Sequence, residues 1–185
     1  MVSLDSSAAL ISSSEAPVFP APVLDRLDRA EIWCREHGQR LTETRRQVLG
    51  LILSDVKPSG AYDLLAKLRA THANAAPPTV YRALDFLLET GLIHRIERLS
   101  AFVGCTHAID CGHGCDHAQW GVHRAQFLIC RGCGKARELE QDSVAVVLLE
   151  AARAVGFQPE SATIEIEGLC AVCQRKDKAA DSDQA

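Results

Sequence analysis

The sequence is poor in aromatic residues and contains no long apolar stretch. Phe, Trp and Tyr make up 5% of its 185 residues while 47% are hydrophobic, so its cores must be built from Leu, Val, Ile and Ala. No apolar run approaches the roughly 20 residues that cross a bilayer. Residues 1–22 lack the basic start and apolar centre of a signal peptide. We therefore expect a globular cytoplasmic protein without a membrane partner.

Two enzyme motifs that use zinc are absent as well. A zinc deaminase needs His-x-Glu upstream and Pro directly before its first Cys-x-x-Cys, whereas here Ile129 precedes Cys130 and no His-x-Glu occurs. The metalloprotease pattern His-Glu-x-x-His is missing too. We expect neither enzymatic activity nor a small-molecule substrate.

Cysteine, in contrast, is frequent, with eight residues, and four of them form two Cys-x-x-Cys pairs. The pairs are Cys130/Cys133 and Cys170/Cys173. In a reducing compartment such pairs favour metal ligation over a redox dithiol or a disulfide, and four thiolates on two short turns suit a tetrahedral structural Zn²⁺. Cys34 differs, because it lies on the apolar side of a predicted helix and is interpreted as a small buried hydrophobe.

Periodic patterns divide the chain into two units between polar ends. Residues 1–22 predict a disordered tail, and residues 176–185, within a polar stretch that starts at 174, predict a flexible one. Residues 23–104 show helical patterns over 24–37, 43–54, 61–72 and 78–90, then strand patterns over 92–98 and 101–105. This order is typical of a winged helix-turn-helix, a DNA-binding unit. Residues 105–175 predict strands at 125–129, 135–140 and 162–167 with a helix at 143–155, which indicates a small α/β domain.

The fourth predicted helix carries the candidate DNA contacts. Arg82 could reach guanine O6 and N7, and Tyr81 a thymine methyl or a phosphate, with Thr79 at the same exposed start. Arg82 could equally be a solvated helix charge. Residues 23–100 hold 12 Lys+Arg against 10 Asp+Glu, a net charge of +2, so charge alone does not establish nucleic-acid binding.

Four segments resemble the ferric uptake regulator family, and its zinc uptake regulator branch most of all. They run from Pro77 to Gly91, from Gly91 to His94, from Phe127 to Gly134 and from Gly168 to Cys173. The resemblance covers about residues 23–175 in the family's order. It implies an α+β protein, with an N-terminal winged helix and a C-terminal α/β dimerisation domain, that represses metal-uptake genes as a zinc-loaded homodimer on double-stranded operator DNA.

The resemblance also implies roles for individual residues. The structural zinc ligands would be Cys130, Cys133, Cys170 and Cys173. A zinc-sensing site between the two domains would use His94, Cys105, His123 and Glu138. Residues that match DNA contacts are Tyr62, Tyr81 and Arg82. Taken alone, His94 could be an ordinary wing residue and Glu138 an exposed strand charge.

The thiolate of Cys105 favours Zn²⁺ over Fe²⁺ or Mn²⁺, which prefer nitrogen and oxygen ligands. At least two zinc ions per subunit are therefore expected. A third, labile zinc could bind the loop after Cys105 through Cys111, Cys115 and His117, although its Gly and Asp residues equally suit a mobile surface loop. Cys115 and His117 could instead supplement the sensing site.

Two other functions share this pattern. An iron or peroxide sensor of the same family would use the same fold. A peroxide sensor is an alternative because thiolates without zinc can oxidise. A zinc-knuckle interaction module without DNA binding would leave the winged helix unexplained.

Overall fold

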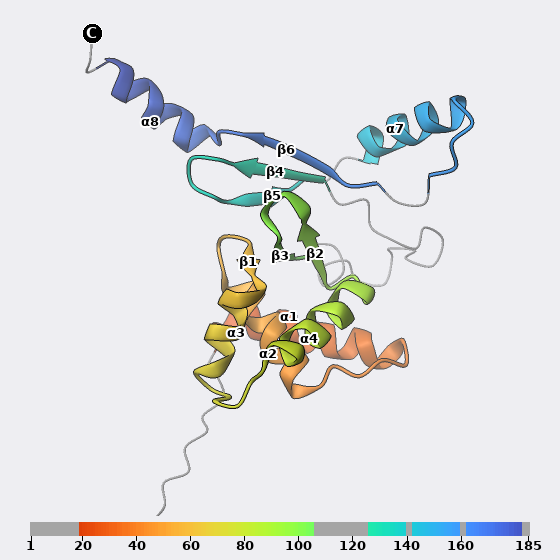
Figure 1. Ribbon diagram of the computed structural model, residues 1–185, viewed down its shortest axis with the longest axis vertical. Helices are drawn as coiled ribbons and strands as arrows, with labels where there is room; N and C mark the ends of the chain where they lie inside the picture. The colour runs from red at the N-terminus through yellow and green to blue at the C-terminus, as the bar shows by residue number, and fades with distance from the viewer. Residues whose placement is uncertain (1–18, 106–125, 140–141, 160–161, 183–185) are drawn as a thin grey trace, which may run out of the picture.

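The computed structural model describes residues 19–105, 126–139, 142–159 and 162–182, which form two lobes that meet at a β-hairpin (Figure 1). The helical lobe comes first in the chain and the second lobe is built on a small sheet. Among the helices of these residues, none combines the length and apolar character that a bilayer span requires.

The first lobe is a winged helix-turn-helix. Its helices are α1 (Ala21–Glu36), α2 (Glu43–Ser54), α3 (Ala61–Arg69) and α4 (Pro77–Glu89). Its strands are β1 (Ser59–Gly60), β2 (Ile93–Ile96) and β3 (Ala101–Gly104), which form an antiparallel sheet in the order β1-β3-β2. The wing is the β2–β3 hairpin, whose tip is the 3₁₀ turn η1 (Glu97–Leu99).

The core of this lobe is aliphatic, as the low aromatic content predicts. Of its buried members only Phe86 and Phe102 are aromatic, and Cys34 is fully buried among them, which confirms its interpretation as a small hydrophobe. Helix α4 starts at two prolines, whose fixed φ suits a first helical turn. It ends before Gly91, which has the positive φ (69°) that stops a helix without steric cost.

The N-terminal boundary differs from the expectation of a tail up to residue 22. Helix α1 starts at Ala21, with prolines at its start, and the Phe19 ring packs over Gly50 on α2. A Cβ on Gly50 would lie 2.4 Å from that ring, so the contact needs a glycine there. The tail prediction fails for residues 19–22 because a long-range packing contact orders them.

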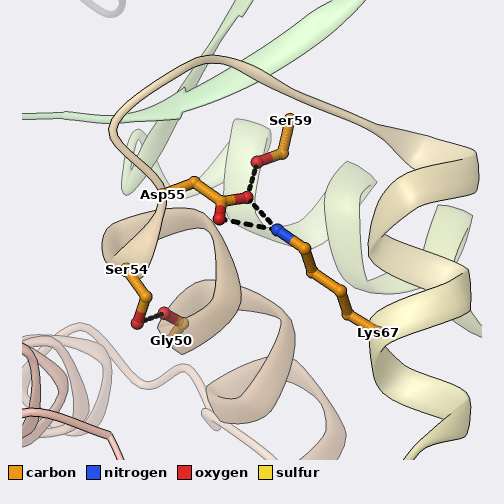
Figure 2. Close-up of polar contacts among 5 residues, drawn as sticks. All are labelled: Gly50, Ser54, Asp55, Ser59 and Lys67. Atoms are coloured by element: carbon orange, nitrogen blue, oxygen red, sulfur yellow. Dashed lines mark hydrogen bonds and ion pairs between the residues drawn. The ribbon is translucent and has the colours of Figure 1, made fainter.

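A polar network fixes the turn between α2 and α3 (Figure 2). The Asp55 carboxylate accepts hydrogen bonds from Lys67 Nζ at 2.6 and 2.5 Å and from the Ser59 hydroxyl. Between the helices predicted over 43–54 and 61–72, the chain also forms strand β1, which was not predicted and pairs with β3. Helix α3 ends at Arg69, three residues before the predicted end.

The second lobe is the α/β unit. It contains β4 (Gln126–Cys130), β5 (Ala136–Glu138), α7 (Asp142–Ala154), β6 (Ile164–Gly168) and α8 (Ala171–Ser182). The sheet order is β5-β4-β6, with β4 antiparallel to β5 and parallel to β6. The predicted α+β fold class is thus confirmed. The polar stretch from 174 was expected to be frayed, but up to Ser182 it belongs to helix α8, which projects from the fold (Figure 1). The sequence did not predict this helix because it has no apolar stripe.

Candidate metal centres and DNA-binding surface

The parallel pairing of β4 and β6 brings the two Cys-x-x-Cys pairs together. Cys130 at the end of β4 lies opposite Gly168 at the end of β6, so both pairs follow strands at the same edge of the sheet. The four Sγ atoms lie within 4.8 Å of one another, and Cys133 Sγ is 3.9 Å from Cys170 Sγ. A tetrahedral site with Zn–S bonds of about 2.3 Å has S···S edges of about 3.8 Å. The cluster therefore fits a zinc ion.

Two glycines shape the first cysteine turn. Gly134 has a φ of 70°, and its N–H donates to the Cys130 carbonyl oxygen at 2.8 Å, which closes the turn. Gly132 faces the second pair, where a Cβ would lie 3.0 Å from Cys173 Sγ. A side chain at 132 would push the two turns apart.

Backbone donors prepare a thiolate in this cluster. The Cys170 N–H donates to Cys130 Sγ at 3.2 Å. This contact, followed by the backbone N–H of Cys133, lowers the pKa of the Cys130 thiol to about 6. A thiolate is the form of cysteine that binds a metal.

A second cluster joins the two lobes. It consists of His94 on β2, Cys105 directly after β3 and Glu138 on β5, whose ligand atoms lie within 4.8 Å of one another. His94 Nε2 is 3.3 Å from Glu138 Oε1, and these side chains are 9% and 8% exposed. Glu138 is therefore not an exposed strand charge, and the alternative of a surface role for it is wrong.

Electrostatics in this cluster favour a positive charge. Burial alone would lower the pKa of His94, but hydrogen bonds with Cys105 and Glu138 outweigh it and raise the pKa to about 9. The Phe127 ring meets the imidazole edge-to-face at 5.6 Å and fixes its orientation. Zinc could take the place of the His94 proton, since a metal binds neutral imidazole.

The backbone around Cys105 is held from two sides. Its N–H donates to the Leu92 carbonyl at 3.0 Å, which extends the wing pairing, and its carbonyl accepts from Arg26 Nη2 at 3.0 Å. Beside it, a Cβ on Gly104 would lie 2.4 Å from the Leu53 side chain. Arg26 was not identified from the sequence, because 79 residues separate it from Cys105 and no spacing signal links them.

The structure thus brings together the four cysteines of one predicted site and three of the four residues of the other. His123, the fourth, lies outside the described residues. The same holds for the three residues of the possible third zinc site, Cys111, Cys115 and His117.

The candidate DNA contacts lie on α3 and α4. Tyr62 is 75% exposed and Tyr81 45% exposed, Arg82 is exposed, and Thr79 is half-buried at the start of α4. The opposite side of α4 packs into the core through Val80, Ala83, Leu84 and Leu87. The two tyrosines and the arginine are thus exposed to solvent, and their side chains are of types that contact phosphates and base edges.

The fold and the two clusters define a winged-helix protein with two candidate metal centres. The model of the ferric uptake regulator family matches residues 36–167, and the chain belongs to this family. It is 38% identical over 147 residues to the zinc uptake regulation protein of Escherichia coli K12, a match that spans 80% of each chain.

Two solved structures are similar to this chain in sequence and fold. A zinc uptake regulator in complex with zinc and DNA is 34% identical, with a TM-score of 0.76, over 86% of this chain and 99% of that one. The holo form of XcZur is 43% identical, with a TM-score of 0.70, over 80% and 96%.

Proposed function

We propose that this chain is a zinc-responsive transcription regulator, mainly a repressor, that binds operator DNA as a homodimer and controls zinc-uptake genes. The observation that carries the proposal is the buried cluster of His94, Cys105 and Glu138, because it takes ligands from both lobes. The relatives support the choice of metal, since the 38% identical protein is a zinc uptake regulator. The iron- or peroxide-sensing alternative is not better supported.

The three side chains supply what a zinc site needs. Cys105 offers a soft thiolate, Glu138 a carboxylate and His94 an imidazole, and the two negative charges balance Zn²⁺. His123 remains our prediction for the fourth ligand. Zinc bound here would join β2 and β3 of the wing to β5 of the sheet. The four-cysteine site would hold a second, structural zinc, and a third zinc in the loop through Cys111, Cys115 and His117 stays a prediction.

Joining the lobes affects DNA binding through geometry. In a dimer each α4 must meet its half-site at a fixed spacing. Restricting the hinge between the lobes raises the fraction of dimers that meet this condition, so zinc and DNA each strengthen binding of the other. Moving a dimer from mostly incompetent to mostly competent requires about a 10²–10⁴-fold preference of zinc for the closed form.

On the DNA side we assign residues 23–104 as the binding domain. Arg82 would donate to a guanine edge, and Tyr62, Thr79 and Tyr81 would contact phosphates or a thymine methyl. Such a regulator would work in the cytoplasm, and we assign it no enzymatic activity.

For dimerisation we assign residues 105–175. On one face of the sheet Leu128 and Ile166 lie opposite each other on paired strands and are 39% and 51% exposed. Helix α7 of the same lobe also exposes apolar side chains, namely Val146, Val147 and Leu148. Apolar surface of this kind is usually covered by a partner, and a second copy of this chain fits the homodimer that we propose.

Fluorescence anisotropy with a palindromic A·T-rich duplex tests the proposal, with zinc and with chelator at several salt concentrations. We expect tight, salt-dependent binding only with zinc. Equal binding under both conditions, or none, would contradict it. Binding that responds to Fe²⁺ or to mild peroxide, but not to zinc, would favour the alternative sensor.

A further inference from the structure

A second contact joins the lobes through residues outside both metal clusters, at the tip of the wing. The Glu165 carboxylate on β6 accepts hydrogen bonds from two successive backbone N–H groups, those of Glu97 at 2.7 Å and Arg98 at 3.2 Å. The Arg98 guanidinium also forms an ion pair with Glu167. We call these interactions of Glu165 and Glu167 with residues 97–98 the wing-tip contact.

The strand register explains why both carboxylates face the wing. Glu165 lies opposite Phe127 and Glu167 opposite Ile129 on β4, and side chains two apart share a face of a sheet. Phe127 and Ile129 are buried against Ile96 of the wing. The carboxylates therefore border an apolar contact between the lobes, and the hairpin lies directly against the sheet in Figure 1.

Glu165 and Glu167 differ in how strongly they can hold the tip of the wing. Glu165 caps the start of the turn η1, where backbone N–H groups have no partner inside the turn, and a charged acceptor makes such bonds strong. Both contacts are exposed to solvent, but Glu165 accepts two bonds from backbone groups, whereas the Arg98–Glu167 ion pair must also hold a long arginine side chain in one conformation and contributes little. Glu165 is thus the main polar anchor of the wing tip.

We propose that Glu165 is a positioning residue that holds the wing against the second lobe through a contact that uses no ligand of the His94, Cys105 and Glu138 cluster, and so sets how much of the protein is closed before zinc binds there. The effect on DNA binding rests on the proposed function, whereas the contact between the lobes does not depend on it. A larger closed fraction without zinc means that less zinc is needed to complete the shift.

The position of Glu165 also links this contact to the four-cysteine cluster. Strand β6 ends at Gly168, whose carbonyl accepts from Arg131 N–H at 2.9 Å in the first cysteine turn, and Cys170 follows. Ligation of the cysteines would therefore fix the register of the strand that carries Glu165.

The first test measures amide hydrogen exchange by NMR in the full-length protein, with chelator and with zinc. We compare Glu165→Ala, Glu165→Gln and the control Glu167→Gln. Without zinc, the Glu97 and Arg98 amides should exchange about tenfold faster in Glu165→Ala than in the wild type, and by an intermediate factor in Glu165→Gln, which keeps one acceptor oxygen. Glu167→Gln should change exchange less than twofold.

The second test titrates zinc against DNA binding in the same variants. Glu165→Ala should need about three- to tenfold more free zinc for half-maximal binding, with the same affinity for DNA at saturating zinc. Equal amide exchange in wild type and Glu165→Ala without zinc overturns the proposal, as does an unchanged zinc requirement. If the wild type binds DNA without any zinc dependence while the exchange difference persists, the proposed function fails and the contact stands.

Discussion

Replacing Cys105 with serine removes the sulfur ligand that the described residues contribute to the cluster between the lobes, while leaving its shape nearly unchanged. Cys105 is fully buried, and its backbone is held by Leu92 and Arg26, so the serine hydroxyl should occupy the same place. A serine hydroxyl does not ionise near neutral pH and is a hard donor. The substitution therefore changes the ligand chemistry and leaves the fold intact.

The size of the effect follows from the ligand count. Structural zinc sites with four ligands bind with about 10–16 kcal/mol, or about 2.5–4 kcal/mol per ligand. Since about 1.4 kcal/mol is a factor of ten, losing one ligand should weaken zinc binding at this site about 10²–10³-fold. Half-maximal DNA binding should then require a similarly higher zinc concentration, because the two equilibria are linked.

The assay is competition for zinc against a chromophoric chelator, followed by anisotropy with operator DNA. The four-cysteine cluster of Cys105→Ser should still bind one zinc tightly, and the weaker zinc should disappear from the titration. Cys34→Ala is the matched control, because Cys34 is an equally buried thiol outside both clusters, and its zinc stoichiometry should match the wild type. If Cys105→Ser binds both zinc ions as tightly as the wild type, the cluster is not a zinc site.

Three further predictions use the same protein. Arg82→Ala should weaken operator binding by about 1–3 kcal/mol in anisotropy, whereas Arg35→Ala, which removes an exposed arginine on α1, should not. Leu128→Asp should shift the protein to a monomer in light scattering, whereas Val56→Asp, at a 69% exposed site in the first lobe, should leave it dimeric. Cys34 should resist alkylation at pH 8 until the protein unfolds, because burial raises the pKa of its thiol to about 11; the stability from its neutral form is full below pH 9 and is lost as the pH rises toward 11.

Local patterns were enough to predict most of the elements. Helix α2 has the predicted bounds, residues 43–54, because its apolar stripe ends just before a segment that contains Pro58 and Gly60. Apart from β1, which was not predicted, the strands of both lobes lie within about two residues of their predicted ends. The four cysteines could be assigned to one cluster since two Cys-x-x-Cys pairs after strands leave few other geometries. The boundaries 23–104 and 105–175 stay predictions.

The contacts between the lobes were less accessible from sequence. His94 and Glu138 were identified only by resemblance, because one buried histidine and one strand carboxylate carry no periodic signal. Arg26 and Glu165 were missed altogether, since each acts on backbone atoms 79 and 67–68 residues away. A side chain that accepts hydrogen bonds from backbone N–H groups cannot be identified from the residue types of its partners, because nearly every residue type has such a group.

The small sheet of the second lobe carries the four-cysteine cluster, Glu138 and Glu165 on neighbouring strands. Strand β4 ends in Cys130, pairs through Phe127 with Glu138 on β5, and pairs through the same residue with Glu165 on β6. One residue of register slip in either pairing would turn Glu138 or Glu165 to the opposite face. Joining the ends of β4 and β6 through four cysteines opposes such a slip. The cysteine cluster therefore matters for DNA binding without touching DNA, because it holds the two carboxylates where the wing can meet them.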